Sequence, residues 1–265
     1  MMFALFAIAI TTLFSVGSLV LLNYGRYLGL LYLKQKGDGG TAGLASVEGA
    51  VFALIGLLLA FTISGALQRF DERRQLVIQE ANAVGTAYDR LGLFEGDVAR
   101  NLQARLKDYL GARIDLYRMP HDFGLWNNEE VWSREQQDKI LELKTGLWDA
   151  AAAACSQSNF RPACGLALPA LNSVFEAARL RLGAAEKHPP QIIYVMLFGL
   201  GLGGSLLAGF GMAAATARSW VHMVTFTAAL AVTLYVVTDM EFPRLGLIRV
   251  DGFDHFLADV HAQMR

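Results

Sequence analysis

The chain has 265 residues, of which 54% are hydrophobic and 18% are charged, and its formal net charge is -1. The hydrophobic share exceeds the roughly 45–50% usual for soluble proteins, and the mean hydropathy is positive. A nearly neutral chain offers no strongly basic surface, which argues against nucleic acid as a partner. The composition therefore predicts a protein whose main partner is the lipid bilayer.

Four stretches carry no charged side chain, and each is long enough to cross a bilayer. A membrane-spanning helix needs about 20 apolar residues to cross roughly 30 Å of hydrocarbon. The sequence therefore predicts an all-α protein with four transmembrane helices in two hairpins, and the uncharged stretches are residues 1–25, 49–68, 189–217 and 219–238.

The chain order implies four regions. They are a first hairpin at 1–68, a soluble helical insert at 69–188 that continues the second span, a second hairpin at 189–240, and a cytoplasmic tail at 241–265. Most of the charged residues lie in the insert, whose helical patterns fall at about 97–118, 129–155 and 167–187, with no period-two strand pattern.

The first span could also be interpreted as a secretory signal. We interpret it as a retained helix for three reasons: it lacks a basic start, its apolar run exceeds the roughly 7–15 residues of a signal core, and no clear cleavage site follows that core.

The second span carries small or polar residues at intervals of three and four, which places them on one helical face. This seam either packs closely against another helix, as small residues do in membranes, or faces an aqueous or ion path. No proline follows the span, so we expect one helix over about 47–91, roughly 65 Å long. The seam residues are Gly49, Ala53, Gly56, Ala60, Ser64 and Gln68.

Glu48 precedes the seam and has two interpretations. An acid there either caps the start of the helix, where the helix dipole favours negative charge, or forms a charged ring at a pore mouth. The third span is rich in glycine and includes Gly199 and Gly203 in a Gly-x-x-x-Gly pair, which permits close approach of another helix.

The fourth span ends in two acids, Asp239 and Glu241, which are costly at the membrane edge unless they pair or reach water. We expect an ionic cluster with basic residues that leave the membrane on the same face. It either clamps the two hairpins together or senses ions. Its members are Arg69, Arg73, Arg74, Asp239, Glu241 and Arg244.

Basic residues near the spans predict the orientation. Eight lie on the insert side and four on the other, so the positive-inside rule places the insert and both termini in the cytoplasm. Cys155 and Cys164, both in the insert, should then be reduced thiols, whereas an oxidising compartment would favour a disulfide between them. The eight are Arg69, Arg73, Arg74, Arg179, Arg181, Lys187, Arg244 and Arg249, and the four are Arg26, Lys34, Lys36 and Arg218.

The sequence shows no signature of an enzyme. It has no Gly-x-Ser-x-Gly elbow, no phosphate-binding loop and no His-Glu-x-x-His pair. The two cysteines do not form a Cys-x-x-Cys pair and have no histidine nearby, so a metal site is not expected. We therefore expect neither a catalytic site nor a cofactor.

Three blocks of sequence resemble the bestrophin-like family of bacterial membrane proteins. The first is EGAVFALIGLLLAFTISGA at 48–66 with RFDERR at 69–74 and EANAVGTAY at 80–88, the second is LPALN at 168–172, and the third is DMEFPRLGLIR at 239–249. The resemblance covers nearly the whole chain. It implies a bacterial inner-membrane protein, similar to bestrophins, which are oligomeric anion channels with two membrane hairpins around a helical cytoplasmic region.

The functional expectation is therefore a homo-oligomeric ion channel whose second span lines the pore. Phe52 and Phe61 lie near the seam, and aromatic constrictions gate pores by dewetting. Only Asp239 and Glu241 follow the last span, so no run of acids corresponds to the calcium clasp of true bestrophins. The alternative is a non-conducting membrane scaffold or sensor whose insert binds a partner.

Overall fold

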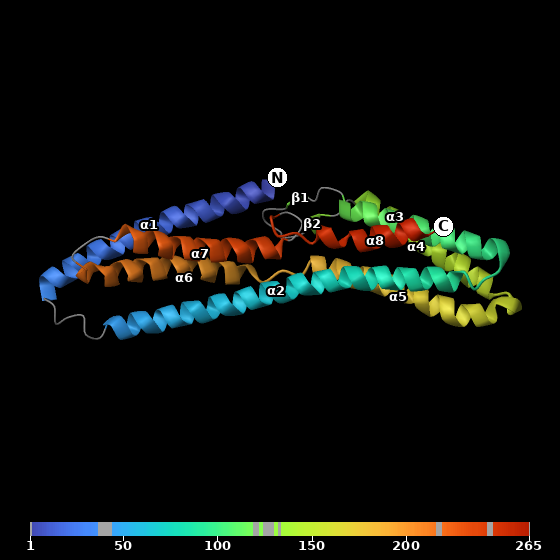
Figure 1. Ribbon diagram of the computed structural model, residues 1–265, viewed down its shortest axis with the longest axis horizontal. Helices are drawn as coiled ribbons and strands as arrows, with labels where there is room; N and C mark the ends of the chain where they lie inside the picture. Colours follow the sequence, from blue (N-terminus) through green and yellow to red (C-terminus); the bar gives the residue numbers. More distant parts are fainter. Residues whose placement is uncertain are drawn as a thin grey trace. The chain divides into compact units, whose positions relative to one another are not determined.

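The computed structural model describes residues 2–36, 44–118, 122–123, 130–131, 134–215, 219–242 and 246–264. Figure 1 shows the elements, which in chain order are α1 (Met2–Lys36), α2 (Leu44–Leu91), α3 (Gly96–Arg118), β1 (Asp122–Phe123), β2 (Glu130–Val131), α4 (Arg134–Cys155), η2 (Ser158–Phe160), α5 (Arg161–Ala185), α6 (Gln191–Gly211), η3 (Met212–Ala214), α7 (Trp220–Glu241), η4 (Asp251–Phe253) and α8 (His255–Gln263).

The predicted fold class is confirmed, because α1, α2, α6 and α7 are all long and apolar enough to cross a membrane. Helix α2 has 48 residues, which corresponds to about 72 Å at 1.5 Å per residue, slightly longer than expected. Two features were not predicted. Strands β1 and β2 form a minimal antiparallel pair, and the tail contains α8.

The chain divides into two compact units. We call residues 1–68 with 188–248 the membrane unit, and residues 69–187 with 249–265 the insert unit. Helix α2 contributes its first half to the membrane unit and its second half to the insert unit. The tail is likewise divided, because its start belongs to the membrane unit and α8 belongs to the insert unit.

Hydroxyl groups join three helices inside the membrane unit. The Ser18 hydroxyl on α1 lies 2.8 Å from that of Ser205 on α6 and 3.1 Å from that of Thr227 on α7. Ser205 also donates to the carbonyl of Gly201. All three side chains are buried, and such hydrogen bonds stabilise helix association where no water competes.

Glycines let α1 and α6 approach closely. A Cβ on Gly25 would overlap the carbonyl oxygen of Leu206, and one on Gly209 would overlap that of Leu22. Gly17 lies against Leu202 and Gly29 against Ala213, so residue numbers increase in the same direction along both helices. Helices α1 and α6 are therefore parallel, as spans one and three of a four-span chain should be. The Gly-x-x-x-Gly pair does not take part in this contact, because a Cβ on Gly199 or Gly203 would meet no atom within 4 Å among the described residues.

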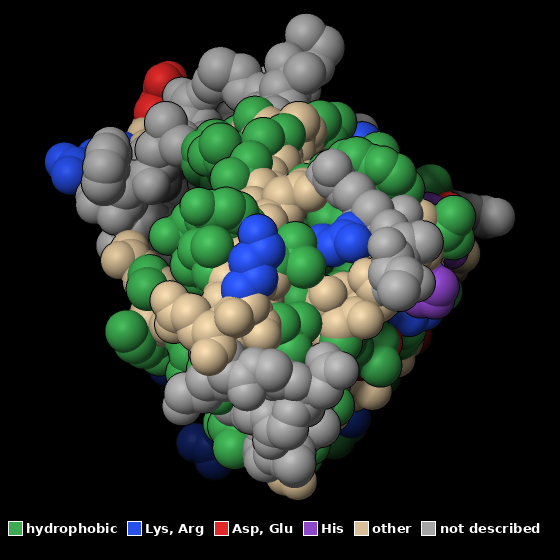
Figure 2. All heavy atoms as spheres, turned by 90° about the vertical axis from the view of Figure 1, so that its left-hand side faces the viewer, with side chains coloured by type: hydrophobic (Ala, Val, Ile, Leu, Met, Phe, Trp, Pro, Cys, Tyr) green, Lys and Arg blue, Asp and Glu red, His purple; other side chains and the backbone are tan. Residues whose placement is uncertain are grey.

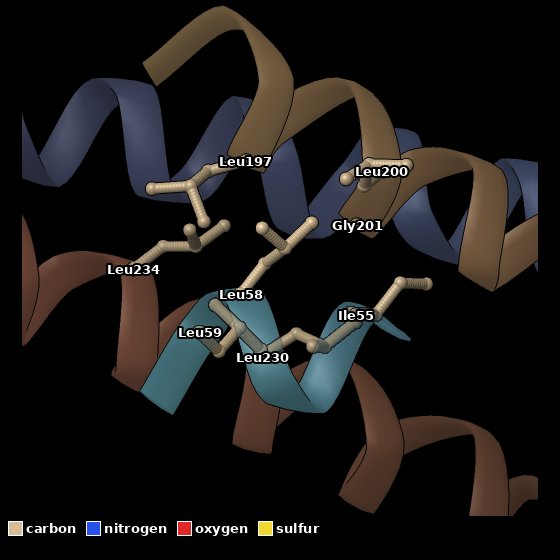
Figure 3. A pocket seen from close by; sticks show the side chains of 8 residues that line it. All are labelled: Ile55, Leu58, Leu59, Leu197, Leu200, Gly201, Leu230 and Leu234. Carbon is tan, nitrogen blue, oxygen red and sulfur yellow. The ribbon is translucent and has the colours of Figure 1, made fainter. Parts of the chain in front are cut away.

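Helix α2 packs on α6 and α7 through aliphatic side chains. Figure 3 shows a pocket between the three helices in which Ile55, Leu58 and Leu59 face residues of the other two helices. A Cβ on Gly204 would lie 2.9 Å from the Ile55 side chain. The pocket has no charged lining residue, and the remaining lining residues are Leu197, Leu200, Gly201, Leu230 and Leu234.

Aromatic side chains mark the end of the membrane unit where α1 ends and α2 begins. Tyr24 and Tyr27 stack with ring centroids 6.5 Å apart, and both are exposed, as is Trp220 at the start of α7. This end faces the viewer in Figure 2, where basic side chains lie among hydrophobic ones. Tyrosine and tryptophan are enriched at membrane–water interfaces, so these residues indicate where the unit leaves the bilayer.

The insert unit has a core of leucine, valine and alanine, as the amphipathic patterns predicted. Leu102, Leu106 and Leu110 of α3 are buried, together with Leu147 of α4 and Leu171 of α5. The C-terminal segment docks on this core, because the Lys107 ammonium donates to the carbonyl of Met264 at 2.6 Å. The structure differs from the expectation of reduced thiols, because Cys155 and Cys164 form a disulfide between α4 and α5, the state that the sequence analysis assigned to an oxidising compartment.

Candidate functional site

The seam of α2 is exposed along its whole length. All six residues are exposed in the protomer, and a Cβ on Gly49 or Gly56 would meet no atom within 4 Å among the described residues. The opposite face of the same helix is buried, as Ile55 and Ala66 show. Packing within the protomer therefore does not explain the seam, whose members are Gly49, Ala53, Gly56, Ala60, Ser64 and Gln68.

The two phenylalanines of α2 lie in different environments. Phe61 is 68% exposed and lies on the open side of the helix beside the seam. Phe52 instead makes an edge contact with Phe226 of α7, with ring centroids 6.1 Å apart, and lies next to Gly204 of α6. Of the two candidate gates, only Phe61 has its ring available to a path outside the protomer.

Glu48 faces the end of α6. Helix α2 begins at Leu44, so Glu48 lies in the second turn and is not the N-cap. A Cβ on Gly211 would lie 2.7 Å from the Glu48 carboxylate, which fills the space that the glycine leaves. The Glu48 side chain is half-buried. Its contact with α6 therefore gives this side chain a packing role within the membrane unit.

Asp239 is held by backbone amides at the end of α7. Its carboxylate accepts hydrogen bonds from the N–H of Leu247 at 2.9 and 3.0 Å and from that of Ile248 at 2.6 Å, and the side chain is fully buried. Gly246 gives the chain room to turn here, because a Cβ would overlap this carboxylate. An acid at a helix C-terminus opposes the helix dipole, and these three bonds offset that cost.

Two basic members of the expected ionic cluster, Arg73 and Arg74, have partners inside the insert unit. Arg73 donates to the carbonyls of Ala184 at 3.0 Å and Lys187 at 2.9 Å. Arg74 pairs with Asp71 at 3.2 Å, and its guanidinium lies 4.2 Å from the ring centroid of Phe253. Glu241 is fully buried, and Arg69 belongs to the insert unit. Arg244 lies outside the described residues, so the cluster stays a prediction.

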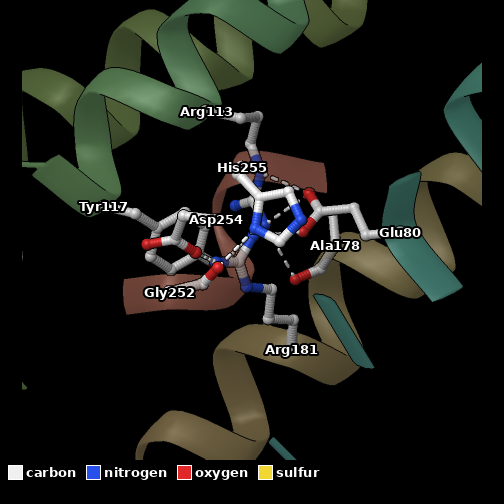
Figure 4. A network of polar contacts seen from close by, with 8 residues as sticks. All are labelled: Glu80, Arg113, Tyr117, Ala178, Arg181, Gly252, Asp254 and His255. Carbon is white, nitrogen blue, oxygen red and sulfur yellow. Dashed lines mark hydrogen bonds and ion pairs between the residues drawn. The ribbon is translucent and has the colours of Figure 1, made fainter. Parts of the chain in front are cut away.

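A buried ionic network that the sequence analysis missed lies in the insert unit (Figure 4). The Glu80 carboxylate on α2 accepts from Arg113 on α3 and Arg181 on α5, each at 2.9 Å. Arg181 also pairs with Asp254 of the C-terminal segment at 2.6 Å and stacks on the ring of Tyr117 at 3.6 Å. The side chains of both arginines and of Glu80 are at most 5% exposed, so these charges are almost completely shielded from water.

The partners in this network keep it charged. Burial alone would lower the pKa of Arg113, but the neighbouring Tyr117 and Glu80 raise it above its usual range. Arg113 also donates to the Tyr117 hydroxyl at 2.9 Å and the Ala178 carbonyl at 3.2 Å. The network therefore joins three helices and the C-terminal segment as a structural element. Among the described residues, no group of three or more His, Cys, Asp and Glu converges on a metal-sized site.

Comparison with solved structures supports the fold. A tyrosine-to-alanine variant of a bacterial bestrophin homologue from Klebsiella pneumoniae has a TM-score of 0.64 at 14% identity, covering 93% of this chain and 98% of that one. An isoleucine-to-threonine variant gives 0.67 at 13% identity, with coverages of 94% and 99%. A third structure of the homologue gives 0.62 at 14% identity, with the same coverages.

A search of curated proteins finds no match. The model of the Bestrophin-like domain matches residues 41–252, which include the α2 seam, Glu80, Arg113 and Arg181 of the buried network, and the turn around Asp239. The resemblance found in the three sequence blocks is thus confirmed over most of the chain. This four-span membrane protein belongs to the Bestrophin-like family.

Proposed function

We propose that the chain is one subunit of a homo-oligomeric ion channel in which α2 lines the conducting path. The observation that carries this proposal is the exposed seam of α2. Ser64 and Gln68 are polar, and polar side chains facing hydrocarbon are unfavourable. Contact with water or with another subunit removes that cost. Four helices of one subunit can hardly enclose a pore, so a path beside α2 requires several copies of the chain.

The proposed gate is Phe61. Its exposed ring lies beside the seam, and a ring of phenylalanines from several subunits would form a constriction that gates by dewetting. No lysine or arginine lies among the seam residues, so the seam itself supplies no preference for anions. The proposed location is the bacterial inner membrane, with the insert and both termini in the cytoplasm, as the basic residues predict.

Planar bilayers containing the purified protein test this function. The wild type should conduct, and Ala60→Trp should reduce the conductance at least tenfold because it fills the path. Val232→Trp on α7 is the matched control, since Val232 is exposed on a different helix; it should leave the conductance unchanged. Phe61→Ala should alter the open fraction. Absence of current over a range of salts and voltages, or equal effects of both tryptophans, would contradict the proposal.

Crosslinking in native membranes distinguishes the channel from a scaffold or sensor. The channel requires a closed oligomer of identical subunits, whereas a scaffold needs only the same fold and a partner for the insert. If crosslinking yields monomers alone, the channel is excluded. A homo-oligomer that carries no current would leave the scaffold as the remaining function.

A further inference from the structure

The disulfide between Cys155 and Cys164 lies where two helices of the insert unit meet. Cys155 ends α4, Cys164 lies in the first turns of α5, and their Cα atoms are 5.8 Å apart. They are the only cysteines of the chain. Cys155 is half-buried and Cys164 is buried, so the two sulfurs differ in their access to solvent.

The bridge closes a short turn that packs on a second turn of the insert unit. Phe160 lies inside the closed loop, and its ring centroid is 5.3 Å from that of Phe94, which follows α2. Both rings are buried. Arg90, in the last turn of α2, donates to the carbonyl of Leu166 on α5 at 3.3 Å. The bridge thus restrains the residues that hold α4 and α5 against the end of α2.

The proposed orientation places the insert unit, and with it this disulfide, in the cytoplasm. Cytosolic disulfides in ordinary bacteria are transient and redox-sensing, because cellular thiols keep cysteines reduced. We propose that Cys155 and Cys164 form a reversible thiol–disulfide couple that responds to oxidation in the cytoplasm and takes small-molecule disulfides as its oxidant. This inference rests on the cytoplasmic location that forms part of the proposed function.

The exchange proceeds in two steps. The thiolate of Cys155, the more accessible residue, attacks one sulfur of the small-molecule disulfide, forming a mixed disulfide and releasing one thiolate. The thiolate of Cys164 then attacks the Cys155 sulfur, forming the intrachain bond and releasing the second thiolate. Two protein thiols are oxidised and one small disulfide is reduced to two thiols, which take up the two protons.

Oxidation should therefore tighten the turn, and reduction should loosen it. In the oxidised protein the bridge limits how far Phe160 can move from Phe94. In the reduced protein, side-chain packing and hydrogen bonds, such as that from the Ser156 hydroxyl to the carbonyl of Ala153, hold residues 156–163 without a covalent restraint. The buried network around Glu80, in the same unit, does not involve either cysteine and should be unaffected.

The first experiment traps the redox state in living cells. Cells producing the full chain are quenched in acid with or without the thiol oxidant diamide, and free thiols are labelled with a polymer maleimide that shifts the band on a gel. We expect two labelled thiols without diamide and none after it. Thiols that stay free after diamide would overturn the couple while leaving the channel proposal untouched. A bond present in unstressed cells would overturn both the couple and the cytoplasmic orientation.

The second experiment measures the effect on the fold. Hydrogen exchange of the oxidised, purified chain in detergent is compared before and after dithiothreitol. Amides of residues 156–163 should exchange about tenfold faster after reduction, whereas those around Glu80 should not change. The Cys155→Ser/Cys164→Ser double variant should be insensitive to dithiothreitol. Equal exchange in both redox states would overturn the proposed coupling, whatever the bilayer recordings show.

Discussion

The membrane unit and the insert unit are stabilised by different contacts, although α2 belongs to both. In the membrane unit, α1 and α6 are joined by backbone contact at Gly25 and Gly209 and by the hydroxyls of Ser18 and Ser205. In the insert unit, large aliphatic side chains form the core, and Glu80 is buried between two arginines. Between helices surrounded by lipid the hydrophobic effect is weak, so close packing of small residues and hydrogen bonds stabilise the membrane unit. In the insert unit, which faces water, the hydrophobic effect stabilises the aliphatic core.

The same comparison explains the two faces of α2. In the membrane unit, its aliphatic face packs on α6 and α7 while its small-residue seam remains exposed. In the insert unit, Val77, Val84 and Ala87 are buried. Both halves of α2 have exposed residues, but those of the insert half, such as Gln75 and Gln79, are polar. The membrane half also exposes large apolar side chains, such as Leu57 and Phe61, for which a bilayer or other subunits supply the remaining contacts.

The largest expected effect comes from the insert. Glu80→Gln removes the charge that compensates Arg113 and should destabilise the unit by about 3–5 kcal/mol, because it leaves buried positive charge. Glu72→Gln is the control, since Glu72 pairs with Lys187 at the exposed surface and should change stability by at most about 1 kcal/mol. Thermal unfolding in detergent measures both. Similar melting temperatures for the two variants would show that the network is not structural.

The membrane unit should be most sensitive at its glycine contacts. Gly209→Ala should destabilise the unit by about 3 kcal/mol, because its Cβ would overlap the carbonyl of Leu22 and force α1 away from α6. Gly203→Ala has open space around it in the protomer and should fold normally. Yield of monodisperse protein and unfolding temperature report the difference. If Gly203→Ala proved the more harmful variant, the assigned contact face of α6 would be incorrect.

A smaller loss is expected at the end of α7. Asp239→Asn keeps the shape of the side chain but removes the charge that attracts the N–H groups of Leu247 and Ile248, and should cost about 2 kcal/mol. Thr238→Val is the control, since the Thr238 hydroxyl donates to the carbonyl of Leu234 within its own helix. Hydrogen exchange at residues 246–248 should increase in the first variant alone.

The smallest expected effect concerns the hydroxyl contacts. Ser18→Ala should destabilise the membrane unit by about 1 kcal/mol, the usual size for interhelical hydrogen bonds in membranes. Thr12→Ala removes an exposed hydroxyl that bonds to Ile8 in the same helix and should have little effect. Comparing unfolding in mixed detergent for the two variants measures this contribution, and a larger loss for Thr12→Ala would contradict it.

The sequence predicted the helices well because charge and apolar length report directly on a bilayer. Uncharged runs located all four spans, and the absence of proline after Gln68 indicated the long α2. The seam was also visible, because intervals of three and four identify a helical face. Whether that face packs within the protomer could not be predicted, since it depends on which face of α6 and α7 meets Ile55.

Long-range pairings were the main omissions. Glu80, Arg113, Arg181 and Asp254 lie far apart in the sequence, and nothing in their local patterns indicates that they meet. The positive-inside count included Arg181 among the basic residues near the spans, whereas its side chain is buried in the insert unit. Gly199 and Gly203 matched a known motif, but glycine at Gly201, Gly204 and Gly209 makes the contacts, because register is decided by both helices together.

Cysteine accessibility along α2 tests the central claim, that the seam lines a conducting path. In a background with Cys155→Ser and Cys164→Ser, single cysteines replace Ala53, Ala60 and Ser64 on the seam, or Ile55 and Leu59 on the buried face. A charged, water-soluble thiol reagent should reduce bilayer currents through the seam variants within seconds and leave the buried-face variants unaffected. Currents that persist in every seam variant after confirmed labelling, or block that shows no helical periodicity, would contradict the account.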